Sequence, residues 1–207
     1  MKTLAINTAG PLVEVALING DKTNFASDGF KKASESLFVF IDELLAGAKL
    51  ELKDLDNILV VTGPGSFTGI RIGLTFARTV GQTLNKKIIP VTYHELLAYI
   101  NKDVLQKIII TDAANGLYYV SEIGVDLCVK NYDQLKEFLA KNNWCLVVTE
   151  EKLKDKIAPL SQNILIAVDN KDNLVSAARD KTRKAITYKK IEPVYIRQSQ
   201  AEEKSND

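Results

Sequence analysis

Apolar and polar residues alternate along the first fifty positions in a pattern that predicts three strands followed by a helix. The strands are expected at Leu4–Thr8, Leu12–Ile18 and Thr23–Ala26. Asn19-Gly20-Asp21 is a strong hairpin signal between the second and third strands. Apolar residues then recur at helical spacing from Leu37 to Ala48, and Ser34 is a suitable N-cap for that helix.

The next stretch joins a strand, Ile58–Val61, to the turn Gly63-Pro64-Gly65 and a long helix with a bare face. Small residues recur every four positions along that helix, at Gly69, Gly73, Ala77 and Gly81. Each interior glycine costs a helix about 1 kcal/mol relative to alanine. We therefore expect another backbone to approach this face closely. A strand at Lys87–Val91 and a helix at His94–Ile100 complete a βββαβαβα order, which predicts a mixed sheet with helices packed on it.

The second half of the chain repeats the start of the first. LAINTAGPLVEVALING and IIITDAANGLYYVSEIG share a strand, polar turn, strand order, and Asn7 in one falls where Asp112 lies in the other. This internal similarity predicts two lobes of related fold. The expected division is a first lobe over residues 1–102, a second lobe over 103–197 and a flexible polar tail over 198–207.

Composition excludes several classes of protein. The 27 basic and 26 acidic residues give a net charge of +1, unlike a domain that binds nucleic acid by itself. Basic residues cluster only at 181–190, KTRKAITYKK, which we interpret as a solvated turn. No apolar run approaches the length of about 18 residues that a membrane span needs, and the N-terminus lacks a signal-peptide pattern. We expect a cytoplasmic protein.

The glycine turn is a candidate phosphate cradle, because a glycine loop before a helix directs backbone amides at an anion. GPGSFTG lacks the GK[ST] ending of a P-loop, and Thr68 replaces the third glycine of GxGxxG. Ser66 also lacks the GxSxG register of a nucleophile elbow. A tight strand-to-helix turn is the favoured interpretation.

Other side chains offer little chemistry. His94 is the single histidine and has no motif around it, so we expect a surface or capping role. Cys128 and Cys145 lack a CxxC pattern and read as reduced thiols, and no metal site is expected. The first turn of each lobe could face a shared cleft that holds a nucleotide and its metal. Asp112 could supply one carboxylate there, but Asn7 in the other turn is neutral and a poor ligand for Mg²⁺.

Four sequence blocks together resemble the TsaB (YeaZ) family, the glycoprotease-like relatives of the threonylcarbamoyl transferase TsaD. They are LAINTA at the N-terminus, VTGPGSFTGIRIGLTFARTVG, TDAANGLYY and the late EPVYIR. The resemblance runs in order from Lys2 to about Arg197, and the GPGSFTGIRIG block is its most specific part.

The resemblance implies an α/β, two-lobed, actin-like and Hsp70-like ATPase (ASKHA) fold without catalysis or a metal. Such chains serve as dimerisation and scaffold subunits for TsaD, with TsaE as a further ATPase partner. The complex places N6-threonylcarbamoyl on adenosine 37 of tRNAs that read codons beginning with A. The implied partners are TsaD, TsaE and a second copy of the chain when it is alone. Contact with tRNA occurs only through the complex, ATP or ADP binds at the complex interface, and no membrane is involved.

In the family, the two long helices of the first lobe form the contact surface. The residues that this implies here are Ser34, Leu37, Phe38, Gly69, Ile70, Arg71, Gly73, Phe76, Ala77 and Gly81. A vestigial nucleotide cleft would involve Asn7, Thr8 and Asp112. The chain departs from the family at Asn7, where an Asp is usual, and at Ala33, where a His is common. An ATP-dependent kinase, hydrolase or peptidase of the same superfold is the alternative.

Overall fold

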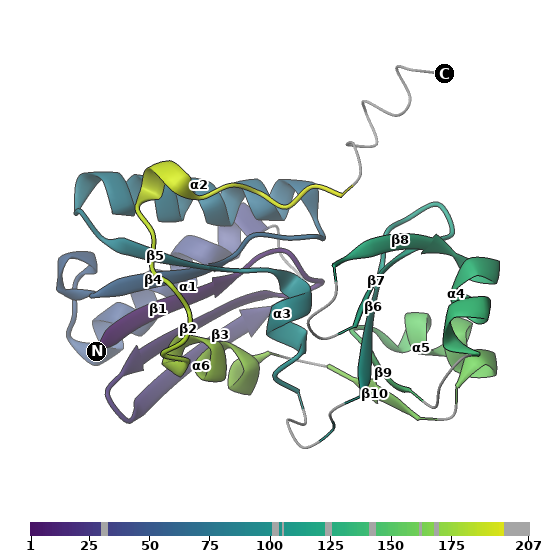
Figure 1. The fold of residues 1–207 in the computed structure, drawn as a ribbon. Coiled ribbons are helices and arrows are strands. Elements are labelled where there is room, and N and C mark those ends of the chain that lie inside the picture. Colours follow the sequence, from purple (N-terminus) through teal and green to yellow (C-terminus); the bar gives the residue numbers. More distant parts are fainter. Residues whose placement is uncertain are drawn as a thin grey trace.

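Two lobes, each built on a five-stranded mixed sheet, make up the protein (Figure 1). The computed structural model describes residues 1–29, 33–100, 104, 106–122, 126–140, 144–161, 163–167 and 170–196. The first sheet comprises β1 (Lys2–Asn7), β2 (Val13–Asn19), β3 (Lys22–Asp28), β4 (Asn57–Val61) and β5 (Lys87–Val91). The second comprises β6 (Lys107–Asp112), β7 (Leu117–Glu122), β8 (Cys128–Asn131), β9 (Cys145–Val148) and β10 (Ile164–Ile166).

Both sheets have the same topology. The strand orders are β3-β2-β1-β4-β5 and, from the matching edge, β8-β7-β6-β9-β10. In each sheet the first strand is antiparallel to the second and parallel to the fourth. Asn7 ends β1 and Asp112 ends β6. The predicted two-lobed α/β fold with an internal repeat is therefore confirmed.

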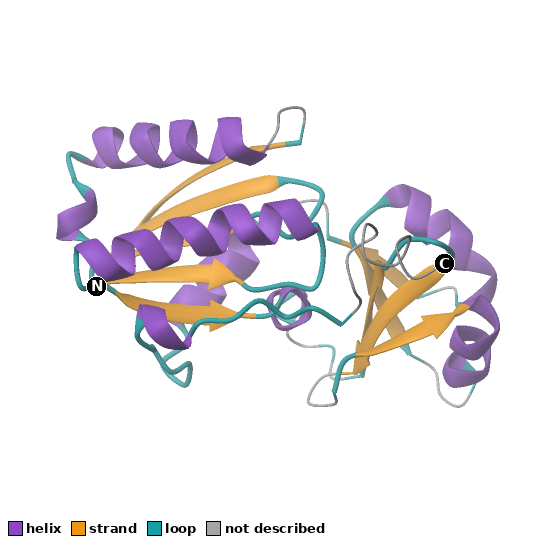
Figure 2. Ribbon diagram, turned by 90° about the horizontal axis from the view of Figure 1, so that it is seen from above, coloured by secondary structure: helices purple, strands orange, loops and turns teal. Residues whose placement is uncertain are grey.

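Helices cover both faces of the first sheet. The helices are α1 (Ala33–Ala48), α2 (Phe67–Thr83), α3 (Tyr93–Leu97), α4 (Tyr132–Leu139), α5 (Glu151–Ile157) and α6 (Lys171–Arg179), with short 3-10 turns at Leu52–Asp54, Ala158–Leu160 and Tyr188–Lys190. Of these, α4 and α5 pack on the second sheet. Helices α1 and α2 lie side by side on one face (Figure 2). Helix α6 packs on β1 and β2 from the opposite face, next to α3. The predicted N-cap Ser34 lies inside α1, because that helix already includes Ala33.

Two hydrophobic clusters form the core. The larger one fills the first lobe and continues into the second through Ile109, Val147 and Ala167. Their strand neighbours Ile108 and Leu146 point the other way, into a second cluster beneath α4 and α5. Because side chains alternate across a strand, β6 and β9 contribute to both clusters. The larger cluster thus spans both lobes, and the smaller one belongs to the second lobe alone.

The C-terminal part of the chain returns to the first lobe, which differs from the expected second lobe over 103–197. Leu174 of α6 and Ile191 belong to the larger cluster, and Ile186 forms an antiparallel bridge with Ile88 of β5. The physical reason is that α3 has only five residues, so α6 covers the rest of that sheet face. Residues 101–103 at the expected boundary and the predicted tail over 198–207 lie outside the described residues.

Candidate interaction face and interlobe cleft

The glycine turn before α2 is shaped by the chain's own backbone. Ser66 donates its amide to the Ala9 carbonyl oxygen at 2.8 Å, and its side chain accepts from the Gly69 amide at 3.2 Å. Gly65 has a φ of 151°, and a Cβ there would lie 2.1 Å from the Ala9 oxygen. The turn therefore packs against the first turn of the lobe, and the favoured interpretation of a tight strand-to-helix connection agrees with this geometry.

The bare face of α2 begins against the end of β1. A Cβ on Gly69 would lie 1.9 Å from the Thr8 carbonyl oxygen, and one on Gly73 would lie 2.6 Å from the Thr8 hydroxyl. That hydroxyl donates to the Gly69 carbonyl oxygen at 2.7 Å. The close approach expected from the sequence is real, and the backbone that approaches belongs to the same chain.

The far end of the bare face is also filled from within. A Cβ on Gly81 would lie 2.9 Å from the Cβ of Tyr188, and Ala77 is fully buried. The small residues therefore make room for the first lobe's own turn and its returning C-terminal segment. The family resemblance places these small residues at a partner contact, but their bare side packs within the lobe itself.

Most of the residues predicted for a partner interface lie inside the molecule. Three of the ten are exposed: Ser34, Phe38 and Arg71. The other seven are buried: Leu37, Gly69, Ile70, Gly73, Phe76, Ala77 and Gly81. The interface assignment stays a prediction, and only the outward side of α1 and α2 can take part in it.

The outward side of this helix pair carries exposed apolar side chains, and we call it the α1–α2 face. Phe38 and Val39 of α1 are each 50% exposed. The ring of Phe38 meets the ring of Phe76 on α2 edge-on, with centroids 6.0 Å apart. Sequence reasoning missed Val39, because it follows Phe38 on the outer side of the helical pattern. Two adjacent exposed apolar residues on one helix were the available signal.

An aromatic cluster closes the N-terminal end of the α1–α2 face. Tyr195 stacks on Phe67 with ring centroids 4.8 Å apart, and the Arg71 guanidinium lies 3.9 Å from the centroid of the Phe67 ring. Arg71 Nε also donates to the Tyr195 hydroxyl at 3.4 Å. Tyr195 and Ile196 remain 41% and 39% exposed, so the returning segment adds apolar surface to this end.

Asn7 belongs to a buried polar network that contains a carboxylate. Its side-chain amide donates to Glu14 at 2.6 Å and accepts from the Ala9 amide at 3.1 Å. Glu14 also accepts from the backbone and side-chain nitrogens of Asn170, at 2.7 and 2.9 Å. Both Asn7 and Glu14 are fully buried. The network ties the first hairpin to the start of α6 and leaves Asn7 committed to structure.

Sequence reasoning missed Glu14. The signal was a carboxylate at the second position of the apolar strand that starts at Val13, since an acid inside a buried strand must be hydrogen bonded to be tolerated. Its partner Asn170 is 156 positions away and could not be paired with it from the sequence alone.

The predicted nucleotide-cleft residues do not share one surface. A cavity of about 190 Å³ between the lobes is lined by Asp112, Glu150, Ser66 and neighbouring residues. Asn7 and Thr8 lie beneath it and are not among its lining. Asp112 is exposed and accepts from the Ala114 amide at 2.8 Å, which closes its own tight turn.

Two buried side chains fill the boundary between the lobes. Burial raises the pKa of the Tyr93 phenol, and the nearby Glu14 carboxylate acts in the same direction. His94 joins its ring nitrogens to the hydroxyls of Ser121 and Thr111, at 2.7 and 2.9 Å. Burial lowers the pKa of His94 to about 3, so the ring is neutral. The expected surface or capping role of His94 is wrong, because two second-lobe strands enclose it.

A wider cavity of about 550 Å³ lies beside His94, between α3 and the second sheet. Within the described ranges, no group of three or more His, Cys, Asp or Glu is placed to hold a metal. Cys128 and Cys145 are free thiols in the second lobe, half-buried and buried. None of the described helices has the length and apolar character to cross a membrane. The side chain of Ala33, the other departure from the family pattern, is outside the described set.

A model of one protein family matches residues 28–139, more than half of the chain. That family is described as "TsaD: tRNA N6-adenosine threonylcarbamoyltransferase". The chain belongs to this family. Curated relatives named TsaB support its place among the TsaB/YeaZ members, as the sequence blocks predicted.

The TsaB/YeaZ relatives differ in how much of the chain they cover. The tRNA threonylcarbamoyladenosine biosynthesis protein TsaB of Bacillus subtilis is 34% identical over 100 residues, 47% of this chain and 44% of that protein. TsaB of Buchnera aphidicola from Acyrthosiphon pisum is 26% identical over 82% of this chain and 85% of its own length. The chain spans less than half the length of the first curated relatives that it matches.

The fold of this family member is also found among solved structures. YeaZ from Pseudomonas aeruginosa has a TM-score of 0.75 at 17% identity, and the match covers 94% of this chain and 99% of that one. Identity at that level supports the shared two-lobed fold and nothing about partners.

Proposed function

We propose that this TsaB/YeaZ-type chain is a noncatalytic subunit of the apparatus that forms threonylcarbamoyladenosine in tRNA, and that it binds a TsaD-like transferase through the α1–α2 face. The observation that carries the proposal is the pair of half-exposed residues Phe38 and Val39 beside Phe76. Large apolar side chains left in water on one helix pair are typical of a protein-binding surface. The names of the curated relatives supply the pathway.

The chemistry of the cleft favours a scaffold over an enzyme. Its cavity of about 190 Å³ is smaller than the ligand pockets of about 300 Å³ or more that hold small molecules. Asp112 and Glu150 both line it, so a triphosphate there would need a cation between it and the two carboxylates. Asn7 lies at the position of the family's usual acid, and its side chain is hydrogen bonded to Glu14. The chain would then have no cofactor of its own, and any ATP or ADP would bind at the junction with partners.

The partner arrangement extends the same proposal. A TsaD-like subunit and a second copy of this chain would compete for the α1–α2 face, and a TsaE-like ATPase would join the assembled pair. Transfer RNA would then be held by the complex as a whole.

Copurification with a TsaD-like partner tests the proposal. Replacing Phe38 and Val39 by serine should weaken the partner's binding by roughly 30-fold or more, because buried aromatic anchors at interfaces are worth about 2 kcal/mol each. Neither side chain lies in the core, so circular dichroism should be unchanged. The matched control is Tyr132→Ser, which removes a side chain of the second lobe that is 36% exposed. Equal binding by the double variant and the control would exclude the α1–α2 face.

The alternative of an ATP-dependent enzyme has its own readout. ATP hydrolysis by the purified chain alone, abolished by Asp112→Ala, would contradict the noncatalytic role even if the partner binds.

A further inference from the structure

Positive charge is concentrated in one short C-terminal segment. Residues 179–190, which we call the basic segment, carry six basic side chains and one acid. The other 195 residues carry 21 basic and 25 acidic side chains and are net negative. A net charge of +1 for the whole chain hides this separation.

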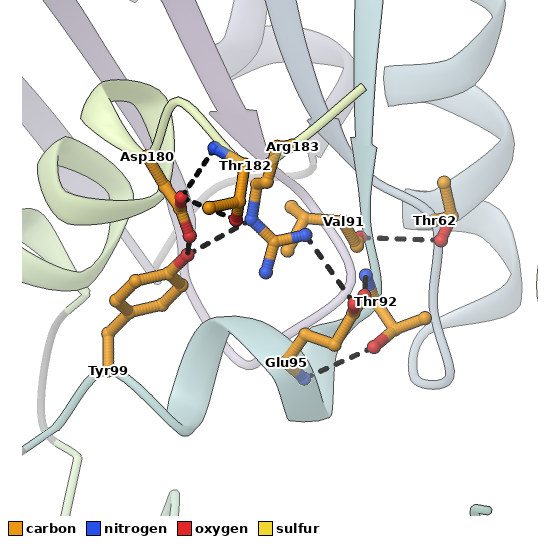
Figure 3. Close-up of polar contacts among 8 residues, drawn as sticks. All are labelled: Thr62, Val91, Thr92, Glu95, Tyr99, Asp180, Thr182 and Arg183. Atoms are coloured by element: carbon orange, nitrogen blue, oxygen red, sulfur yellow. Dashed lines mark hydrogen bonds and ion pairs between the residues drawn. The ribbon is translucent and has the colours of Figure 1, made fainter. Parts of the chain in front are cut away.

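The basic segment is held in place at its start by a polar clasp (Figure 3). Tyr99 donates its hydroxyl to the Asp180 carboxylate at 2.5 Å, and Thr182 donates its amide and hydroxyl to the same carboxylate at 2.9 and 2.7 Å. These hydrogen bonds lower the pKa of Asp180 to about 2, and the bond from Tyr99 has the largest effect. Arg183 adds a hydrogen bond to the Tyr99 hydroxyl and an ion pair with Glu95, at 3.1 and 3.5 Å.

The middle and end of the segment are fixed to the first lobe. Ile186 exchanges both backbone hydrogen bonds with Ile88, at 2.9 and 2.7 Å, so the segment extends the first sheet beyond β5. Tyr188 then packs on Gly81 of α2. In Figure 1 this yellow part of the chain rises from α6 across the sheet edge and continues along α2. The lysines are exposed, as expected for a solvated turn, and the backbone that carries them is fixed to the first lobe.

The clasp uses Arg183, and Arg179 donates to the carbonyl oxygens of the β2–β3 hairpin. Four lysines of the segment remain exposed with no carboxylate oxygen within 4.0 Å among the described residues: Lys181, Lys184, Lys189 and Lys190. The bridge at Ile88 brings the exposed Lys87 to the same edge. Glu95 and Asp180, two acids beside Lys184, both take part in the clasp, and Glu192 follows the segment at an exposed position.

We propose that the basic segment, together with Lys87, is a contact surface for the phosphate backbone of an RNA, and this rests on the proposed function, which places a tRNA in the same complex. Lysine ammonium groups bind phosphates as point charges without reading sequence. The surface adjoins α2, so RNA held by a partner on the α1–α2 face would pass beside it. The proposed direct contact differs from the expectation of tRNA contact only through the complex, and that expectation stays a prediction.

The test compares two variants of the full chain with equal loss of charge. One replaces Lys181, Lys184, Lys189 and Lys190 by glutamine. The control replaces four exposed lysines elsewhere, Lys22, Lys136, Lys152 and Lys156, by glutamine. Binding of an unmodified tRNA transcript is measured by fluorescence anisotropy at several salt concentrations, for the chain alone and with the TsaD-like partner.

The segment variant should lose about tenfold or more in tRNA affinity at 0.1 M salt. Its salt slope should fall by roughly three, because each phosphate contact contributes about 0.7 to 0.9. The control should stay within about twofold. Equal affinities for the two variants would overturn the proposal. Binding to phosphatidylserine vesicles is measured for the same variants. A segment variant that loses vesicle binding but keeps its tRNA binding would also overturn the proposal.

Copurification separates this proposal from the one on which it rests. Both lysine variants should still bind the TsaD-like partner, because the α1–α2 face is intact. If partner binding fails for the unchanged chain as well, the proposed function fails, while the anisotropy of the chain alone still decides the RNA contact.

Discussion

The first turns of the two lobes have the same place in the same topology, and they have opposite environments. Asn7 ends β1 and is fully buried. It donates to the Glu14 carboxylate, which also accepts from Asn170. Asp112 ends β6 exposed, and its turn relies on its own backbone, with a φ of 74° at Gly116. The helix that follows the fourth strand makes the difference. In the first lobe it is α2, with 17 residues and three glycines, and in the second it is α5, with seven residues.

A long helix without side chains on its inner face can sit directly on the preceding turn. Gly69 and Gly65 let α2 and its entrance touch Thr8 and Ala9, which keeps Asn7 and Thr8 buried behind the turn residues that line the cavity. Helix α5 is too short to do this, and the second turn stays open to the cavity. Topology alone therefore does not make a nucleotide site, because both turns line the cavity but only Asp112 of the two strand-end side chains reaches it.

The largest effect is expected for Gly69→Ala, which tests whether α2 rests on the first turn of the first lobe. Its Cβ would overlap the Thr8 carbonyl oxygen, so we expect a loss of about 3 kcal/mol or more in the free energy of unfolding. Urea denaturation measures it. The control is Gly47→Ala in α1, where a Cβ meets nothing within 4 Å and should stabilise the protein by up to about 1 kcal/mol. If both changes are tolerated equally, α2 does not rest on the first turn as described.

Gly73→Leu should also disturb packing inside the first lobe. It would push against the Thr8 hydroxyl inside the lobe, so a loss of partner binding in that variant would report damage to the fold. The α1–α2 face is tested only by outward residues such as Phe38.

The second prediction compares the carboxyl groups at the two turns. Glu14→Gln should cost about 1 to 3 kcal/mol in the free energy of unfolding, because the new amide presents donors to the donors of Asn7 and Asn170. Asp112→Asn, at an exposed position, should change it by about 0.5 kcal/mol or less. Chemical denaturation at neutral pH gives both values. Similar costs at the two sites would mean that Glu14 is not tied into the core.

The smallest expected effect concerns the boundary between the lobes. His94 has a pKa of about 3 in the folded protein and about 6.5 when unfolded, so its neutral form stabilises the fold above pH 6.5. As pH falls from 6.5 to 5.5 the unfolded chain takes up the proton first, which should remove about 1 kcal/mol. Thermal unfolding across that range measures the loss. His94→Gln should flatten the dependence, and an unchanged pH dependence in that variant would contradict the neutral buried ring.

Much of the fold could be predicted from the sequence because periodicity is local. The alternation around Val13 and the glycine spacing from Gly69 each depend on neighbours a few residues away. The repeat of strand, turn and strand correctly predicted two lobes. The segment after β10 was misplaced, since an amphipathic helix such as α6 carries no record of which sheet it covers.

The candidate site, too, could be predicted only in part from the sequence. The sequence by itself determined that α2 needs a close neighbour, since glycines at four-residue spacing have no other use in a helix interior. Only the tertiary structure decided that the neighbour is Thr8 of the same chain, that Glu14 meets Asn170, and that the basic segment lies beside β5. These contacts join residues far apart in the chain, and a local pattern cannot specify which distant surface meets it.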